Sequence, residues 1–271
     1  MIDKLITKIV EEEAPSKDVA VLMSGGVDSL TCAFSAMRLG KNVHTYTMYV
    51  DGKETPDSLA AKEAAEIFGW NHHEIDVPVN NVKDDFLRLM RYYDCKKKTH
   101  VECTFPFLYV YPHIKEKHVL SGVAADGWYG VSKRANIHFK HTKELFDKFR
   151  NDYFGAENPA GILQQEQLCE EIEANLVAPY VGHKEVIDWM MSYDHDFFNK
   201  PYQKAPIIKA YPEFEELPKK RKHANLQLVA GIPEYFEKLL EDKQLNFKNR
   251  QRTMDLVRDY VGYEPKTSLF A

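Results

Sequence analysis

The stretch from Val19 to Ser29 reads VAVLMSGGVDS and decides the fold of this chain. Five apolar residues precede a Gly-Gly pair, and a helical pattern follows from Leu30 to Leu39, where Gly40 ends it. We therefore expect a buried strand, a tight turn and a helix. Such a turn directs backbone N–H groups and the positive end of a helix dipole at one place. The pattern predicts a binding site for a nucleotide phosphate.

The polar residues of this loop suit that ligand, because glycine lets the backbone approach a phosphate and serine hydroxyls can donate to it. The loop has neither the Lys-Ser/Thr pair of a Walker A motif nor the Rossmann G-x-G-x-x-G. It resembles the SGG-x-DS loop of the PP-loop ATP pyrophosphatases, also called adenine nucleotide alpha hydrolases. Members of that superfamily split ATP to AMP and pyrophosphate and usually adenylate a substrate. An ordinary strand-helix turn is the alternative.

Composition narrows the class of protein. The chain has 271 residues, 44% of them apolar, which is enough for one large core or two modest ones. A net charge of −5 gives no general attraction to nucleic acid or to an anionic membrane. No apolar run approaches the roughly 20 residues of a transmembrane helix. The acidic N-terminus is unlike a signal peptide, and the four cysteines form no close pair. We expect a cytoplasmic protein with reduced thiols that does not bind membranes.

Strand and helix patterns alternate in the first half of the chain. Strands are expected at 19–23, 41–50, 71–78 and 118–122, and helices at 2–13, 30–39, 56–68 and 82–93. Alternation of this kind predicts an α/β fold, a parallel sheet of about five strands with helices on both faces. Ligands in such sheets bind outside the carboxyl ends of the strands. Ser121 and Gly122 follow a strand, as the SGG loop does.

Helical patterns dominate from about residue 140, and we expect no strand there. The expected helices cover 143–153, 162–176, 184–192, 233–241 and 250–261. The prediction divides the chain into an ATP-binding α/β domain of residues 1–145 and a mostly helical portion of residues 146–271. The second portion is expected to pack on the first and to complete the active site.

A second motif lies at residues 120–130, which read LSGVAADGWYG. It resembles the SG-x-GADE-x-FGG segment of the asparagine synthetase synthase domain and of β-lactam synthetase. In that family the aspartates of the two motifs together hold Mg²⁺ on the ATP phosphates, which here implies Asp28 and Asp126. Two carboxylates from separate strand ends can bridge such a cation. A plain Asp-Gly turn is the alternative for Asp126.

The resemblance extends over about residues 15–230 and implies further contacts. Lys204 and Lys222 best match two family lysines that contact phosphate and the acyl-adenylate, with Lys220 as an alternate for the second. A flexible cation suits charge that develops on an α-phosphate. A solvated basic run or a nucleic-acid patch is the alternative for 219–222. Residues expected to bind the nucleotide are Ser24, Gly25, Gly26, Val27, Asp28 and Ser29 around the pyrophosphate, Leu22 and Met48 against the adenine, and Gly122.

The chain departs from the family on the acceptor side. Val123 stands where asparagine synthetase has a glutamate, Asn175 where a second glutamate is expected, and Gly127 where a glutamate follows the metal aspartate. Asparagine and β-lactam synthesis are therefore both disfavoured. No amidotransferase domain is expected ahead of Met1, so nitrogen would come from ammonia, an amine or a partner glutaminase. Candidates for a rebuilt acceptor pocket are Trp128, Tyr129, His138 and His141.

The prediction is an ATP- and Mg²⁺-dependent ligase that adenylates a small-molecule acceptor, releases pyrophosphate and passes the acyl group to an amine or ammonia. One alternative is a PP-loop enzyme that modifies a nucleobase or tRNA, which the net charge disfavours. Another is a nucleotide-binding subunit without catalysis. The spacing of Cys95, His100, Cys103 and His113 would also allow a tetrahedral metal site, or simple packing.

Overall fold

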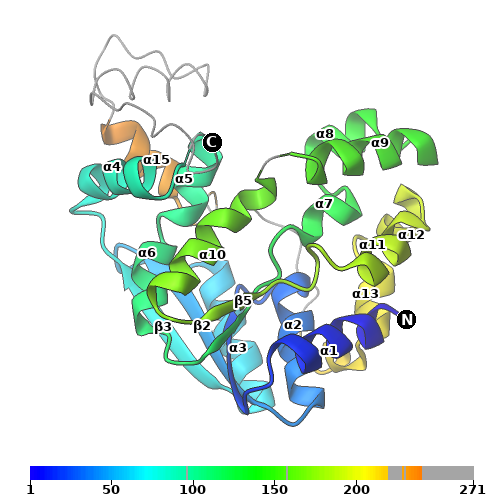
Figure 1. Cartoon of the computed structure of the whole chain (residues 1–271), viewed down its shortest axis with the longest axis horizontal. Coiled ribbons are helices and arrows are strands. Elements are labelled where there is room, and N and C mark those ends of the chain that lie inside the picture. The colour runs from blue at the N-terminus through cyan, green and yellow to red at the C-terminus, as the bar shows by residue number, and fades with distance from the viewer. Residues whose placement is uncertain (96, 157, 219–227, 229, 240–271) are drawn as a thin grey trace.

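The strands form one parallel sheet in the part of the chain that the computed structural model describes, residues 1–95, 97–156, 158–218, 228 and 230–239 (Figure 1). The strand order is β3-β2-β1-β4-β5. Chain order runs from β1 to one edge and then returns to the other side of β1, so β1 and β4 flank the topological switch point. The bounds are β1 Asp18–Leu22, β2 Asn42–Val50, β3 Asn71–Val77, β4 His118–Leu120 and β5 Asn175–Val177. The predicted α/β fold is confirmed.

Helices cover both faces of the sheet. Alternate residues of β1 point to opposite faces, so the strand contributes to a separate core on each side. Val19 and Val21 join a core that contains α1 (Ile2–Glu13), α2 (Val27–Arg38) and α3 (Pro56–Phe68). Ala20 and Leu22 join a second core on the other face. That second core contains α4 (Val82–Tyr92), α5 (Lys98–Thr104), α6 (Phe107–Val110) and α10 (Ile162–Glu171).

Local signals fix the helix α3 at its predicted bounds. The Thr55 side chain accepts a hydrogen bond from the backbone N–H of Ser58, and the Ser58 side chain accepts one from the backbone N–H of Thr55, which together form a capping box. Pro56 starts the helix, and Gly69 ends it in the left-handed conformation, with φ 66°. The amino-terminal half of α3 lies beside the SGG loop, where Ala60 approaches Gly25.

Most of the remaining helices lie on the same side of the molecule as α1, and the last described helix lies beside α4 and α5 (Figure 1). Three short 3₁₀ turns accompany them, at Tyr111–His113, Pro159–Gly161 and Pro212–Glu215. The first core includes residues of several of these helices, such as Phe146 and Ile207, so they share it with the sheet. Their bounds are α7 Ala125–Tyr129, α8 Lys133–His138, α9 Lys143–Phe154, α11 Lys184–Met191, α12 His195–Asn199, α13 Ala205–Ala210 and α15 Ile232–Leu239.

One element of the second half was predicted wrongly. The helix expected over 162–176 ends at Glu171, and Asn175–Val177 is the edge strand β5, paired in parallel with β4. Glu173 has φ 54°, a left-handed conformation that a helix cannot continue through. A strand of three residues is too short to show an alternating pattern. The helix expected at 250–261 lies outside the described residues. None of the described helices has the length and apolar character that a membrane crossing requires.

Candidate functional site

Two loops meet at the switch point, and each has a glycine where neighbouring atoms leave no room for a side chain. Gly25 has φ +67°, and a Cβ there would lie 2.3 Å from the Cβ of Ala60 on α3. A Cβ on Gly122, just after β4, would lie 2.6 Å from the carbonyl carbon of Asp28. Real Cβ atoms do not approach other carbons this closely, so both positions require glycine. The SGG loop is packed against α3 on one side and against the β4 loop on the other.

The SGG loop is held in shape by its own hydroxyl groups. The Oγ atoms of Ser24 and Ser29 lie 3.2 Å apart, and Ser29 Oγ donates to the carbonyl of Gly26 at 3.1 Å. Gly26 N donates to Ser24 Oγ at 3.3 Å. The helix α2 begins after Gly26 with no side-chain cap. Its first N–H groups therefore suit an anion, as the sequence predicts for phosphate.

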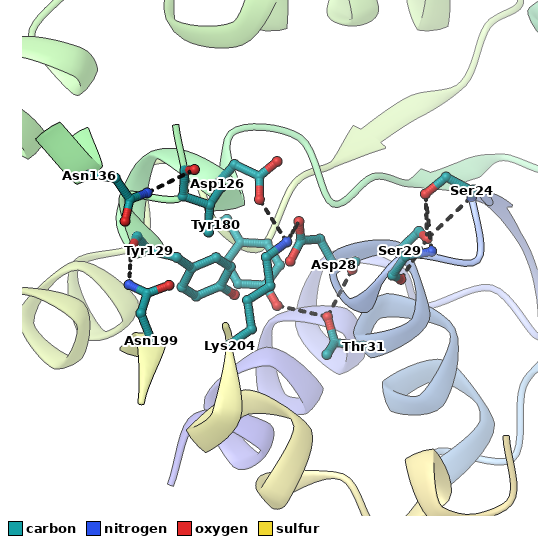
Figure 2. Close-up of polar contacts among 12 residues, drawn as sticks. Ser24, Asp28, Ser29, Thr31, Asp126, Tyr129, Asn136, Tyr180, Asn199 and Lys204 are labelled. Carbon is teal, nitrogen blue, oxygen red and sulfur yellow. Dashed lines mark hydrogen bonds and ion pairs between the residues drawn. The ribbon is translucent and has the colours of Figure 1, made fainter. Parts of the chain in front are cut away.

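Three charged side chains from three separate segments converge beside this loop (Figure 2). Lys204 Nζ lies 2.7 Å from Asp28 Oδ2 and 2.7 Å from Asp126 Oδ1. Asp28 comes from the first turn of α2, Asp126 from α7, and Lys204 from the residue before α13, where it has φ 60°. The side chain of Lys204 is 7% exposed, that of Asp28 17% and that of Asp126 39%. The cluster therefore opens toward solvent on the Asp126 side.

The electrostatics of the cluster follow from burial and from the mutual charges. Burial raises the pKa of Asp28 to about 7, and the nearby Asp126 adds to the rise while Lys204 opposes it. Burial by itself would lower the pKa of Lys204, but the two carboxylates outweigh it and the pKa of the ammonium is raised. The lysine stays charged, and the Asp28 carboxylate depends on a nearby cation for its ionisation.

The two aspartates fit the donor set of Mg²⁺ on a nucleotide. Mg²⁺ is usually held by one or two carboxylates together with substrate phosphate oxygens and water. Asp28 Oδ1 is buried and accepts no hydrogen bond from the described residues. The described chain offers no group of three or more His, Cys, Asp or Glu side chains that could hold a metal. A cation here would accordingly need oxygen ligands from the nucleotide.

A hydrogen-bonded chain behind Asp28 escaped the sequence analysis. Thr31 Oγ1 donates to the carbonyl of Asp28 at 2.8 Å and lies 2.7 Å from the hydroxyl of Tyr180. Trp128 Nε1 donates to the carbonyl of Tyr180 at 2.8 Å. These contacts join α2, α7 and the segment after β5. A buried tyrosine needs a partner for its hydroxyl, but the sequence does not show that Thr31 is that partner.

The other expected nucleotide contacts surround the loop. Leu22 ends β1 and is buried, Met48 lies near the carboxyl end of β2 and is partly buried, and Val27 is partly buried at the start of α2. Their contacts with adenine or phosphate remain predictions. Lys222 and its alternate Lys220 lie outside the described residues.

Two positions noted as departures from the family lie in different places. Val123 follows the β4 loop, and its N–H donates to Ser121 Oγ at 3.3 Å. Asn175 starts β5 and pairs with His118 at the start of β4. In a parallel sheet this is the opposite end of the strand from the loops of the site, and Asn175 is exposed there. The placement of Asn175 in the catalytic shell was wrong, and its identity says nothing about the acceptor.

The suggested acceptor residues do not form one pocket. Trp128 is 3% exposed and stacks on Phe154 with ring centroids 3.8 Å apart, so it is a core residue. His138 and His141 are exposed on and after α8. Tyr129 alone of the four lies against the charged cluster, with its ring centroid 5.1 Å from Lys204 Nζ.

The suggested metal site of Cys95, His100, Cys103 and His113 is not formed, since no metal-binding group of three was found among the described residues. Burial raises the pKa of Cys95 and that of Cys103 to about 12. Both thiols therefore stay protonated near neutral pH, which fits simple packing.

The sequence model of the asparagine synthase family matches residues 2–191. The chain belongs to the asparagine synthase family. This confirms the resemblance to the PP-loop ATP pyrophosphatases of the asparagine synthetase type, a family of ATP-dependent ligases.

Individual relatives of this asparagine synthase family member are distant. A glutamine-hydrolysing asparagine synthetase of Asparagus officinalis is 31% identical over 147 residues, covering 47% of this chain and 25% of its own length. Asparagine synthetase 2 of Arabidopsis thaliana is 28% identical over 239 residues, covering 76% of this chain and 40% of its own length. The chain thus spans well under half the length of these relatives. A predicted tRNA methyltransferase subunit from Methanocaldococcus jannaschii aligns with 64% of this chain and 73% of its own, at 19% identity and a TM-score of 0.34.

Proposed function

We propose that this protein is an ATP-dependent ligase that forms AMP and pyrophosphate. It adenylates a carboxylate or amide oxygen of a small acceptor and then lets an amine or ammonia displace AMP. The observation that supports the proposal most directly is the convergence of Asp28, Asp126 and Lys204 beside the amino end of α2. Family membership supports the ATP-dependent class, and the particular C–N bond is our inference.

Each group of the site has a role in this reaction. The N–H groups at the start of α2 and the hydroxyls of Ser24 and Ser29 would bind the pyrophosphate portion of ATP. Asp28 and Asp126 would hold Mg²⁺, which when bound neutralises phosphate charge. Lys204 carries its charge on a flexible stem already close to both carboxylates, so it can follow the α-phosphate as negative charge develops there. Tight packing around Gly25 and Gly122 keeps the two loops in place, which limits reorganisation during the reaction.

The acceptor differs from that of asparagine synthetase in our proposal. Val123 has no proton to give or take, and Gly127 has no side chain to bind an amine. In addition, a Cβ on Gly127 would lie 2.4 Å from the ring of Tyr153 on α9, so the tyrosine ring fills the space of a side chain at this position. The acceptor is accordingly bound by residues other than the family's glutamates.

Product analysis tests the proposal. Purified protein is incubated with Mg-ATP and a fractionated metabolite extract, and AMP with pyrophosphate is expected as the nucleotide product. Asp28→Asn should abolish it. Asp85→Asn is the matched control, because Asp85 is also a buried aspartate that accepts a hydrogen bond, from Tyr109 at 2.6 Å, but belongs to α4. Formation of ADP, or ATP binding without turnover in every fraction, would contradict the proposal.

A further inference from the structure

Lys204 has a neighbour besides the two carboxylates, the ring of Tyr129. The Nζ atom lies 5.1 Å from the ring centroid, within the range of a cation–π interaction. Tyr129 is 0% exposed, so water does not compete for this face of the ammonium. The same short helix, α7, carries Asp126 and Tyr129 three positions apart, which places both side chains on one side of the helix. One helix therefore offers Lys204 both an anion and an aromatic ring (Figure 2).

The ring of Tyr129 is itself fixed from several directions. Phe198 packs against it with centroids 5.7 Å apart, and Tyr180 meets it edge-on at 6.2 Å. Asn199 Nδ2 donates to the backbone carbonyl of Tyr129 at 2.8 Å. Meanwhile the backbone of Lys204 is in a left-handed conformation, so its long side chain reaches the cluster from a constrained starting point. A ring held this firmly can limit where the ammonium goes.

We propose that Tyr129 is a positioning residue whose aromatic face holds the Lys204 ammonium at the phosphate site. The function of that placement rests on the proposed adenylating activity. The buried hydroxyl of Tyr129 interacts with Tyr180, whereas the contact with Lys204 is made by the ring. The ring, and not the hydroxyl, carries the role, and phenylalanine should replace tyrosine here without loss. Leucine, which removes the ring, should not.

The kinetic test compares Tyr129→Phe and Tyr129→Leu in the pyrophosphate-release assay. A desolvated cation–π contact corresponds to a factor on the order of 5- to 30-fold. Tyr129→Leu should lower kcat by that factor with little change in KM for ATP, because the lysine acts on charge that develops in the transition state. Tyr129→Phe should retain wild-type kcat. Tyr129→Met provides the same test if the leucine variant does not fold.

A matched control separates this effect from the loss of a buried ring. Tyr111 is also 0% exposed, but it lies in the core on the other face of the sheet, and its polar neighbour there is Cys169. Tyr111→Leu should lower the resistance to urea and leave kcat of the folded protein unchanged. Equal losses of kcat in Tyr111→Leu and Tyr129→Leu would overturn the proposal.

A thermodynamic cycle tests the contact without any activity. Urea unfolding is measured for wild type, Tyr129→Leu, Lys204→Met and the double variant, all free of nucleotide. In a cycle that uses Tyr129→Phe little coupling is expected, because phenylalanine keeps the ring. In the cycle that uses Tyr129→Leu the proposal expects coupling of about 5- to 30-fold in the unfolding equilibrium constant. Coupling below about twofold overturns it. If coupling is present while wild type releases no pyrophosphate, the positioning is supported and the proposed function fails.

Discussion

Replacing Gly25 by alanine tests whether packing on α3 sets the shape of the SGG loop. The new Cβ would lie 2.3 Å from Ala60 Cβ, 2.8 Å from Ala60 C and 2.9 Å from Ala61 N, where ordinary contacts are about 3.5–4.0 Å. Two of these atoms are backbone, so α3 itself must shift, and overpacking of this kind costs roughly 1–3 kcal/mol. The left-handed φ of +67° adds about 1–2 kcal/mol for any residue with a Cβ. Together we expect a loss of about 2–5 kcal/mol.

Gly52→Ala is the matched control, because Gly52 has φ +69° and nothing within 4 Å of the added Cβ. It should lose only the conformational part, about 1–2 kcal/mol. The free energy of unfolding is measured by urea titration without nucleotide, and ATP binding by calorimetry. Gly25→Ala should also weaken ATP binding, while Gly52→Ala should not. Adding Ala60→Gly should recover part of the stability, since it removes the shortest contact. Equal losses in the two alanine variants would refute the reasoning.

Further predictions concern the second loop and the titratable groups. Gly122→Ala should cost about 1–3 kcal/mol in urea unfolding and weaken ATP binding, because the β4 loop must move away from Asp28; unchanged ATP affinity would contradict the close approach. Burial lowers the pKa of His195, so the unfolded chain binds a proton there more readily than the native protein does. The free energy of unfolding should therefore decrease as pH falls below the unfolded pKa of about 6.5. Between pH 7.5 and 5.5 wild type should therefore lose more unfolding free energy than His195→Leu does. A larger loss in the variant would contradict the lowered pKa of His195. Desolvation raises the pKa of three thiols to about 12, those of Cys95, Cys103 and Cys169. At pH 8 these thiols should therefore react with iodoacetamide roughly a thousandfold more slowly than an exposed thiol. Rapid labelling seen by mass spectrometry would contradict this expectation.

Local patterns predicted the first half of the fold well because each signal there lies within a few residues. The run before Ser24 predicts a strand, Gly-Gly predicts a turn, and Gly40 predicts the end of α2. The edge strand at Asn175–Val177 could not be found in this way. Its three residues become a strand only because the backbone of β4 lies beside them, and a pairing partner is not a property of the local sequence.

Some residues of the candidate site were also predicted from the sequence, while the contacts between them depend on tertiary packing. Asp28 and Asp126 were paired by the family resemblance, and the rule that ligands bind at the carboxyl ends of parallel strands agrees with that pairing, since both residues follow a strand. Lys204 was picked out by resemblance, and its approach to both carboxylates at 2.7 Å arises from the packing of helices far apart in the sequence. Nothing in the spacing of the chain predicted that Trp128 would be core while its neighbour Tyr129 would contact the lysine.

The sequence by itself determined the strand-turn-helix unit, the parallel α/β class and the identity of the loop that suits a phosphate. These depend on backbone preference and hydrophobic period, which act over short distances. Tertiary structure alone decided that packing requires glycine at positions 25 and 122 and that Asn175 lies at the amino end of β5. It also decided that Lys204 lies between two aspartates and over the ring of Tyr129. Those outcomes depend on atoms that are far apart in the sequence and meet only in the folded chain. Burial there strengthens the interactions between charges, because the local dielectric is low.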